Sequence, residues 1–76
     1  MDYKVIFSEN LKAIRIERRY TQKDLAEKLG ISPSTYANWE QGRREPSINE
    51  IYNLLLVLGI DANDLFDIDT LNLPNQ

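Results

Sequence analysis

Residues 22–41 read QKDLAEKLGISPSTYANWEQ, and this stretch indicates two short helices joined by a tight turn. Thr21 can cap the first helix, because Asp24 stands three positions later, where the acidic partner of a capping box belongs. Gly30 follows the last residue of the helical pattern and suits a left-handed helix end. We therefore expect the first of these helices over about residues 22–29.

The second helix of the pair has its own start signal two residues later. Ser32 is a good N-cap, and Pro33 suits the first turn because its missing N–H would be unpaired there anyway. We expect this helix to run to about Gln41 and to stop at Gly42. Ala26 supplies a small residue where the two helices cross. The apolar anchors of the pair are Leu25, Leu29, Ile31, Tyr36 and Trp39.

Outside this pair, turn signals divide the chain into three further helices. The pattern predicts a helix over about residues 7–18, with Ser8 as a candidate cap. Ser47 and Glu50 form a second capping box, which starts a helix that ends at Gly59. A short helix capped by an aspartate follows it. The expected apolar stripe of the fourth helix consists of Ile48, Ile51, Leu54, Leu55 and Leu58.

The length of 76 residues supports one compact domain with no room for a separate sensor or catalytic unit. Hydrophobic residues make up 42% of the chain and charged residues 28%, as in globular proteins. The expected fold is all-α, a compact five-helix domain over residues 1–66. Residues 67–76 form an acidic and apolar tail that could extend a contact between subunits.

The net charge of −3 hides a strong asymmetry along the chain. Residues 1–46 carry nine basic and seven acidic side chains, whereas residues 47–76 carry five acidic and no basic ones. Local charge matters more than the total for a surface that meets phosphate. The first part of the chain can therefore bind a polyanion although the whole chain is acidic.

Several classes of function are excluded or disfavoured by the composition. The chain has no histidine and no cysteine, which excludes Ser-His-Asp and Cys-His catalysis and the usual zinc sites. The aspartates after residue 60 lack the glycine and the closing glutamate of a calcium loop. The longest apolar run, residues 54–58, is too short to span a bilayer. We therefore expect no enzyme, no metal, no cofactor and no membrane association, and a cytoplasmic location.

The third helix presents a face that suits a DNA groove. At about 100° per residue, its small and neutral-polar side chains fall in one arc that contains no acid. Such a face can enter a major groove, where an asparagine can pair with adenine and an alanine can touch a thymine methyl. An ordinary solvent-facing helix side is the alternative interpretation. The expected base-contacting residues are Ser34, Ala37, Asn38 and Gln41.

Contacts to the DNA backbone are expected on both sides of this helix. Gln22 stands at a helix N-terminus, where free N–H groups favour an anion. Arg43 and Arg44 follow the third helix, although they can equally be solubilising loop charges. Arg15, Arg18 and Arg19 are weaker candidates, because cations near a helix C-terminus also act as caps. The expected backbone-contacting residues are Gln22, Ser32, Thr35, Arg43, Arg44 and Arg15.

The chain resembles the Cro/cI-type, lambda-repressor-like (XRE) helix-turn-helix family over about residues 7–66. The matching segments are YTQKDLAEKLGIS at 20–32, WEQGRREPS at 39–47 and LGI at 58–60. The resemblance implies five helices, with the third as the recognition helix. It also implies that Gln22 contacts phosphate and braces that helix, and that Arg15 and Glu40 form a partly buried ion pair.

Two positions depart from the family pattern. Pro33 stands where the family often has a long polar residue, so base readout would fall to the other groove-facing side chains. Leu56 stands where the family often has lysine or another polar residue, and with it residues 54–58 are all apolar. One helix of a monomer cannot bury such a run on a single face, so we expect a two-fold dimer contact there. The alternative is a widened core. The dimer candidates are Tyr52, Leu56, Leu65, Phe66 and Ile68.

These observations lead to two hypotheses about function. The first is a sequence-specific transcriptional regulator that binds a near-palindromic operator in double-stranded DNA as a homodimer. The second is a protein-interaction module, such as an antitoxin whose main partner is a toxin protein. Such a partner would bind the apolar side chains near Leu56 and the tail residues Ile68, Leu71 and Leu73. The salt dependence of DNA binding discriminates between the two hypotheses.

Overall fold

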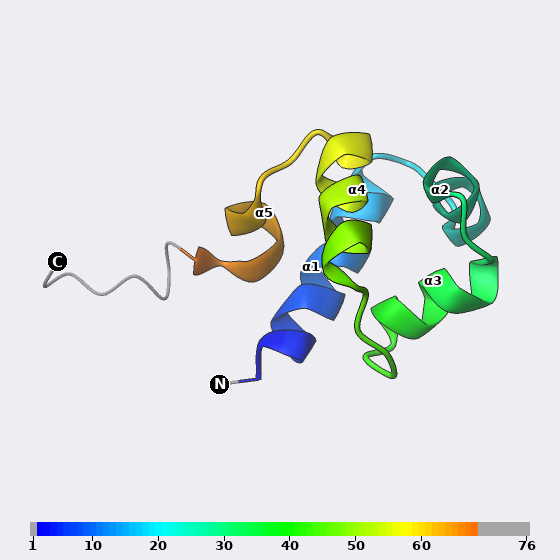
Figure 1. The fold of residues 1–76 in the computed structure, drawn as a ribbon. Coiled ribbons are helices and arrows are strands. Elements are labelled where there is room, and N and C mark those ends of the chain that lie inside the picture. Colours follow the sequence, from blue (N-terminus) through cyan, green and yellow to red (C-terminus); the bar gives the residue numbers. More distant parts are fainter. Residues whose placement is uncertain (1, 69–76) are drawn as a thin grey trace, which may run out of the picture.

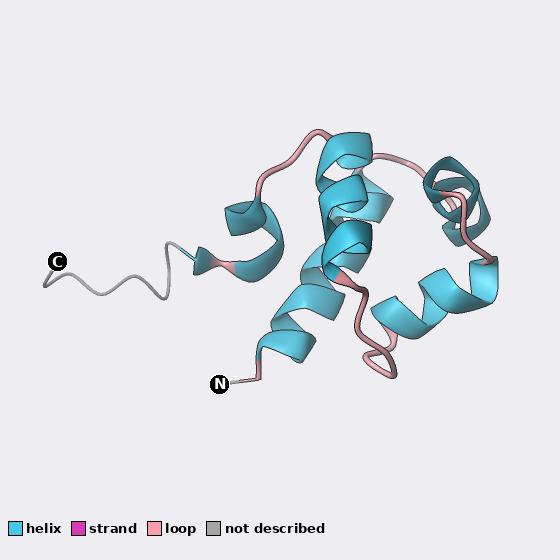
Figure 2. Cartoon of the chain, viewed as in Figure 1, coloured by secondary structure: helices cyan, strands magenta, loops and turns pink. Residues whose placement is uncertain are grey.

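The computed structural model describes residues 2–68, and these form five helices with no strand (Figure 2). The helices are α1 (Tyr3–Glu17), α2 (Gln22–Leu29), α3 (Pro33–Glu40), α4 (Ile48–Leu58) and α5 (Ala62–Phe66). Figure 1 shows α1 and α4 near the centre, with α2 and α3 on one side and α5 on the other. The predicted all-α, five-helix fold is confirmed.

Local capping signals set most of the helix boundaries. Thr21 and Ser47 each form a complete capping box, and Ser32 caps α3 ahead of Pro33. Gly30 ends α2 with a φ of 72°, in the left-handed region where a side chain would be strained. These signals act within one turn of chain, so the boundaries of α2 to α5 lie within a residue or two of the predicted ones.

The start of α1 is the exception. The sequence pattern pointed to Ser8 as the cap, but Asp2 caps the helix a turn and a half earlier by accepting from the N–H of Lys4. Ser8 is instead buried inside the helix, and its hydroxyl donates to the carbonyl of Val5. Its neighbour Phe7 is buried as well, so this turn of α1 packs against the core and does not begin the helix.

The core is formed by side chains from all five helices. Tyr36 and Trp39 of α3 are 0% and 1% exposed, which confirms that they are core residues. Two side-chain hydrogen bonds join α1 to α5 and to α4, across distant parts of the chain. The side-chain amide of Asn10 donates to the carbonyl of Leu65 and ties α5 to α1. The remaining members of the buried core are Phe7, Leu11, Leu25, Ala26, Leu54, Leu58 and Leu65.

The second long-range contact caps α4. Arg18, at the end of α1, donates from its guanidinium to the carbonyl of Leu58, the last residue of α4. A helix C-terminus carries partial negative charge and unpaired carbonyls, and α4 has no basic residue of its own in its last turn. Arg18 therefore supplies a C-terminal capping charge that α4 lacks, which favours the capping interpretation over a phosphate contact.

Candidate nucleic-acid interface

The turn between α2 and α3 holds the two helices at a fixed angle. The N–H of Ile31 donates to the carbonyl of Ala26 at 3.0 Å, which closes the C-terminal end of α2. Leu25 and Ala26 are 0% exposed, so the small side chain at the crossing allows the helices to pack closely. Together these contacts place α3 against α2 with one side of α3 directed to solvent.

The solvent-facing side of α3 carries the four residues predicted to contact bases. Ser34 and Gln41 are exposed, and Ala37 and Asn38 are partly exposed. Gln41 is the C-cap of α3 rather than part of the helix. None of these four side chains is charged. The structure thus brings the predicted set together on one accessible, neutral surface.

A buried network behind α3 centres on the carboxylate of Glu40, whose side chain is only 3% exposed. Arg15 donates to both of its oxygens, from Nε at 2.6 Å and from Nη2 at 3.2 Å. The side-chain amide of Gln22 donates to Oε1 at 3.0 Å, and the hydroxyl of Tyr36 donates to Oε2. The carboxylate therefore links α1, α2 and α3 at one point.

The charge of Glu40 is favoured by these donors. Burial alone would raise the pKa of Glu40, but the hydrogen bonds from Arg15, Tyr36 and Gln22 outweigh it and lower the pKa below its ordinary value. The hydrogen bond to Glu40 raises the pKa of Arg15, and burial raises the pKa of the Tyr36 hydroxyl. The network therefore contains an ionised Arg15–Glu40 pair, the pair that the resemblance implied.

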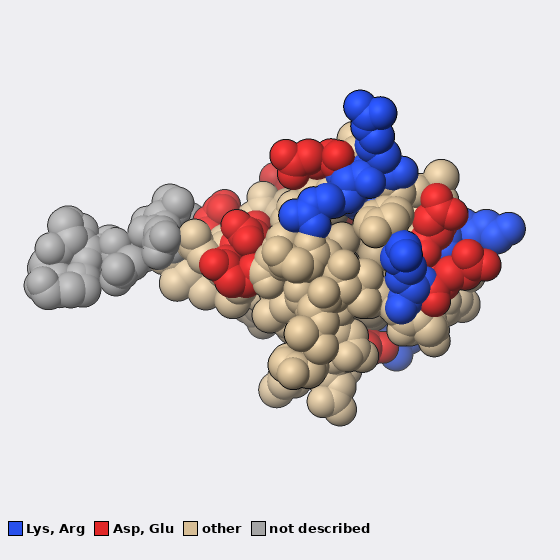
Figure 3. Space-filling view, turned by 90° about the horizontal axis from the view of Figure 1, so that it is seen from above, with Lys and Arg blue, Asp and Glu red and all other residues tan. Residues whose placement is uncertain are grey.

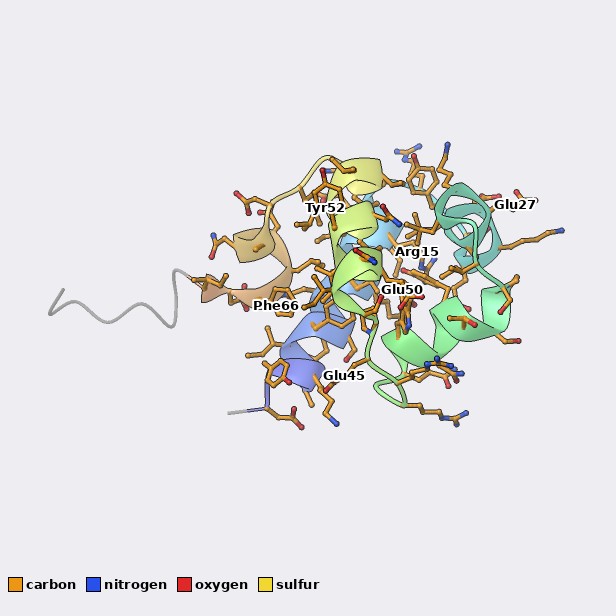
Figure 4. The ribbon with its side chains drawn as sticks, viewed as in Figure 1. Arg15, Glu27, Glu45, Glu50, Tyr52 and Phe66 are labelled. Atoms are coloured by element: carbon orange, nitrogen blue, oxygen red, sulfur yellow. The ribbon has the colours of Figure 1, made fainter. Side chains whose placement is uncertain are left out.

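The position of Arg15 bears on its predicted contact with the DNA backbone. The guanidinium of Arg15 is directed inward (Figure 4), and its third hydrogen bond goes to the carbonyl of Tyr20 at 2.8 Å. Its side chain is 13% exposed. Three of the five N–H groups of the Arg15 guanidinium are thus engaged within the fold, which favours the structural role of Arg15 over a contact with a DNA phosphate. Gln22 has the bracing hydrogen bond that the resemblance implied.

The other predicted backbone contacts lie at the two ends of α3. The hydroxyl of Ser32 accepts from the N–H of Thr35 at 3.1 Å and donates to the Thr35 hydroxyl at 2.9 Å. Ser32 is therefore committed to capping, whereas Thr35 keeps its own hydroxyl hydrogen for another acceptor. Arg43 and Arg44 are exposed in the loop after α3, and the N–H of Arg43 donates to the carbonyl of Asn38 at 2.9 Å.

Folding brings one more cation to this loop, which the sequence pattern did not single out. Lys4, on the first turn of α1, forms an ion pair with Glu45 at 3.6 Å, and both side chains are about half exposed. Figure 4 shows Glu45 near the N-terminal end of α1. The two residues are far apart in sequence, so no local signal could have placed Lys4 beside the arginines.

The predicted dimer residues divide into three groups. Tyr52, Leu56 and Ile68 are 60%, 62% and 46% exposed, so Tyr52 and Leu56 do not widen the core of a monomer. Leu65 is 0% exposed and belongs to the core, because α5 packs against α1. The prediction of a dimer contact at Leu65 is therefore wrong. Phe66 is half-buried and stacks on the ring of Phe7, with centroids 5.6 Å apart.

The predicted inner stripe of α4 also needs one correction. Ile48 was placed with the core-facing residues, but it is 85% exposed. It occupies the first position of α4, directly after the cap Ser47, where the helix extends beyond the core. Leu54 and Leu58 are buried as predicted.

Among residues 2–68, no helix is long and apolar enough to cross a membrane. In the same part of the chain, no three acidic side chains gather in a way that could hold a metal ion. Of the predicted tail, residues 69–76 lie outside the described part, and so do the predictions made for Leu71 and Leu73.

Comparison with known proteins identifies the family. Residues 11–65 match the HTH_3 helix-turn-helix family. The uncharacterized HTH-type transcriptional regulator YqaE of Bacillus subtilis is 38% identical over 60 residues, which cover 79% of this chain and 52% of YqaE. The immunity repressor protein of Bacillus phage phi105 is 38% identical over 63 residues, which cover 83% of this chain and 44% of the repressor.

A solved structure agrees with these relatives. The solution structure of the SOS-response transcriptional repressor LexA from Eubacterium rectale superimposes with a TM-score of 0.82 at 31% identity, over 97% of this chain and 79% of that one. The chain spans only about half the length of YqaE and of the phage repressor. These similarities, together with the α2–α3 geometry, show that the chain belongs to the HTH_3 (XRE-type) helix-turn-helix family of transcriptional regulators.

Proposed function

We propose that the chain binds a near-palindromic operator as a homodimer and represses or otherwise regulates a promoter there. The observation that carries this proposal is the neutral, exposed face of α3, held from behind by the Glu40 network and followed directly by two exposed arginines. A rigid, uncharged reading surface with flanking cations suits base readout in a major groove combined with phosphate contacts. The name of the phage phi105 relative, an immunity repressor, agrees with this role.

Each residue of the interface then has a distinct task. Asn38 is suited to paired hydrogen bonds with an adenine, and Ser34 can donate to or accept from a base edge. Arg43 and Arg44 neutralise phosphates at the C-terminal end of α3. Glu40 accepts one N–H of the Gln22 side-chain amide. The second N–H of that amide, together with the free N–H groups at the N-terminus of α2, contacts the DNA backbone. Thr35 donates its hydroxyl to a phosphate at the other end of α3.

The direct test is selection of bound sequences from a random pool of duplex DNA. We expect two inverted half-sites whose centres lie about 34 Å apart, one helical turn, because each subunit reads one major groove. The affinity should fall steeply with salt as phosphate contacts release counterions. Selection of a single unrepeated site would contradict the dimer, and a salt slope near zero would contradict DNA binding altogether.

A second candidate function is supported by the exposed apolar side chains of α4. Tyr52 and Leu56 are accessible, and no cation lies between residues 47 and 68. An antitoxin-like chain would cover these side chains with a different protein. Co-purification of one stoichiometric partner, together with salt-independent behaviour on DNA, would favour this second function over the first.

A further inference from the structure

The side of α4 that faces away from the core carries an uncharged apolar row. Ile48, Tyr52 and Leu56 follow one another at intervals of four residues, so their side chains lie above one another on one face of the helix. They are 85%, 60% and 62% exposed. The only charged residue of α4, Glu50, accepts from the N–H of Ser47 in the capping box. We refer to Ile48, Tyr52 and Leu56 as the α4 ridge.

The two edges of the α4 ridge differ in charge. Figure 1 shows α5 on one side of α4 and α2 on the other. The charged residues of α5, caps included, are all acidic, whereas α2, which packs on α4, has two lysines and two acidic residues, all exposed, so its charge cancels. Figure 3 shows an uncharged surface between acidic side chains on the α5 side and a mixed group on the opposite side. The acidic residues of the α5 edge are Asp61, Asp64 and Asp67.

A second copy of the chain can cover the α4 ridge in two symmetric ways. If the two-fold axis runs along α4, the helices are parallel and the acidic edge of each copy faces the mixed edge of the other. If the axis runs across α4, the helices are antiparallel and the two acidic edges face each other. Like charges across an interface are unfavourable, so charge favours the parallel arrangement.

The position of the arginine loop leads to the same arrangement. The loop over residues 42–46 ends directly before Ser47, the cap of α4, so the N-terminus of α4 lies beside Arg43 and Arg44. Parallel α4 helices leave both loops on the same side of the dimer, where one duplex can meet both. Antiparallel helices of 11 residues would separate the two loops to opposite ends of the contact.

We propose that the α4 ridge is the contact surface for a second copy of this chain, with the two α4 helices parallel and each ridge residue facing its own counterpart. The inference rests on the proposed function in that it assumes one duplex bound by two subunits. It assigns Ile48 to the contact and places Leu56 against Leu56 of the second copy. One helix face is smaller than a standard interface of roughly 800 Å² per partner, so DNA should strengthen the pairing.

Single-cysteine variants test the arrangement, because the chain has no cysteine of its own. A disulfide needs Cα atoms within about 7 Å, so it reports which residues face each other. Leu56→Cys and Ile48→Cys, oxidised singly with and without duplex DNA, should each form a covalent dimer. Ile16→Cys is the matched control, because Ile16 is 56% exposed on α1, and it should remain monomeric. Circular dichroism of each reduced variant checks that it is folded.

The other outcomes overturn the inference. A dimer that forms only when Ile48→Cys and Leu56→Cys are mixed would show antiparallel helices. Variants that crosslink no better than Ile16→Cys, with DNA present or absent, would show that the α4 ridge does not face a second copy. The unmodified chain is titrated with the same duplex in parallel. DNA binding without crosslinking refutes the α4 ridge as the dimer contact and leaves the proposed function standing. Crosslinking without salt-dependent DNA binding refutes the proposed function.

Discussion

The surfaces around α3 and around α4 are built from the same kinds of helix signals but are supported in opposite ways. Behind the exposed face of α3 lies a network of charged and polar groups around Glu40, whereas α4 is anchored by the apolar side chains of Leu54 and Leu58 in the core. The α3 face is neutral-polar with arginines beside it, and the α4 face is apolar with acids beside it. The comparison shows two separate influences. Capping residues set where each helix begins and ends along the chain, whereas the side chains behind an exposed helix face hold that face in position.

The largest effect should come from breaking the network behind α3. Glu40→Ala leaves the guanidinium of Arg15 buried without its partner and removes the acceptor of Gln22 and Tyr36. Loss of one member of a buried pair costs about 3–5 kcal/mol. Urea unfolding of Glu40→Ala should therefore give a free energy of unfolding that is lower by about this amount, so that the variant is only marginally folded. The control is Glu45→Ala, whose carboxylate is exposed and should cost little. Equal stability of the two variants would refute a structural role for the network.

Acid should weaken the same network in a defined range of pH. The pKa of Glu40 is lowered in the folded chain relative to its ordinary value of 4.5, so its contribution to stability is complete above that value. The contribution is lost as pH falls through the lower folded pKa. Asp24 adds to this trend, because its capping hydrogen bonds with Thr21 lower its pKa too.

Comparison of the chain with Glu40→Gln isolates the contribution of Glu40. Thermal unfolding at a series of pH values should give a smaller loss of stability for Glu40→Gln below pH 4.5 than for the unmodified chain. Parallel curves for the two proteins would mean that Glu40 does not titrate differently in the folded and unfolded states.

On the reading face, Asn38→Ala should weaken binding to the selected operator by about 1–3 kcal/mol and relax the preference at one base position. Asn53→Ala, an exposed asparagine on α4, is the matched control and should bind as before. Fluorescence anisotropy on operators with single base changes measures both effects. The same loss on every sequence would show that Asn38 supports the helix but does not read a base.

Beside that face, Arg43→Ala should lower affinity almost equally on all sequences and flatten the salt slope by about one unit, because one phosphate contact is lost. Lys12 is exposed on α1, has no proposed contact with DNA and provides the control. An Arg43→Ala slope that matches that of Lys12→Ala would identify Arg43 as a solubilising loop charge.

The smallest effect on folding should come from the other surface. Leu56→Lys introduces a charge at a side chain that is 62% exposed, so the free energy of unfolding should change by no more than about 0.5 kcal/mol. Leu54→Ala, about half a turn away on the buried side, should cost about 2–5 kcal/mol. A large loss of stability in Leu56→Lys would mean that Leu56 contributes to the core after all.

The sequence by itself determined the number of helices, most of their boundaries and the composition of the reading face. Thr21, Ser32, Ser47 and Gly30 act within a single turn of chain, so their effects do not depend on the rest of the fold. The inward direction of Tyr36 and Trp39 follows from helical periodicity in the same way. The family resemblance added the pair of Arg15 with Glu40, which local patterns do not show.

Only the tertiary structure decided the roles of residues whose partners are distant in sequence. Arg15 and Arg18 are both cations near the end of α1, yet one is paired with Glu40 and the other caps α4 at Leu58. Lys4 is beside the arginine loop, and Leu65, a dimer candidate in the sequence analysis, is buried because α5 packs against α1. Each outcome depends on how the helices pack against one another. A partner that lies dozens of residues away leaves no periodic signal in the sequence.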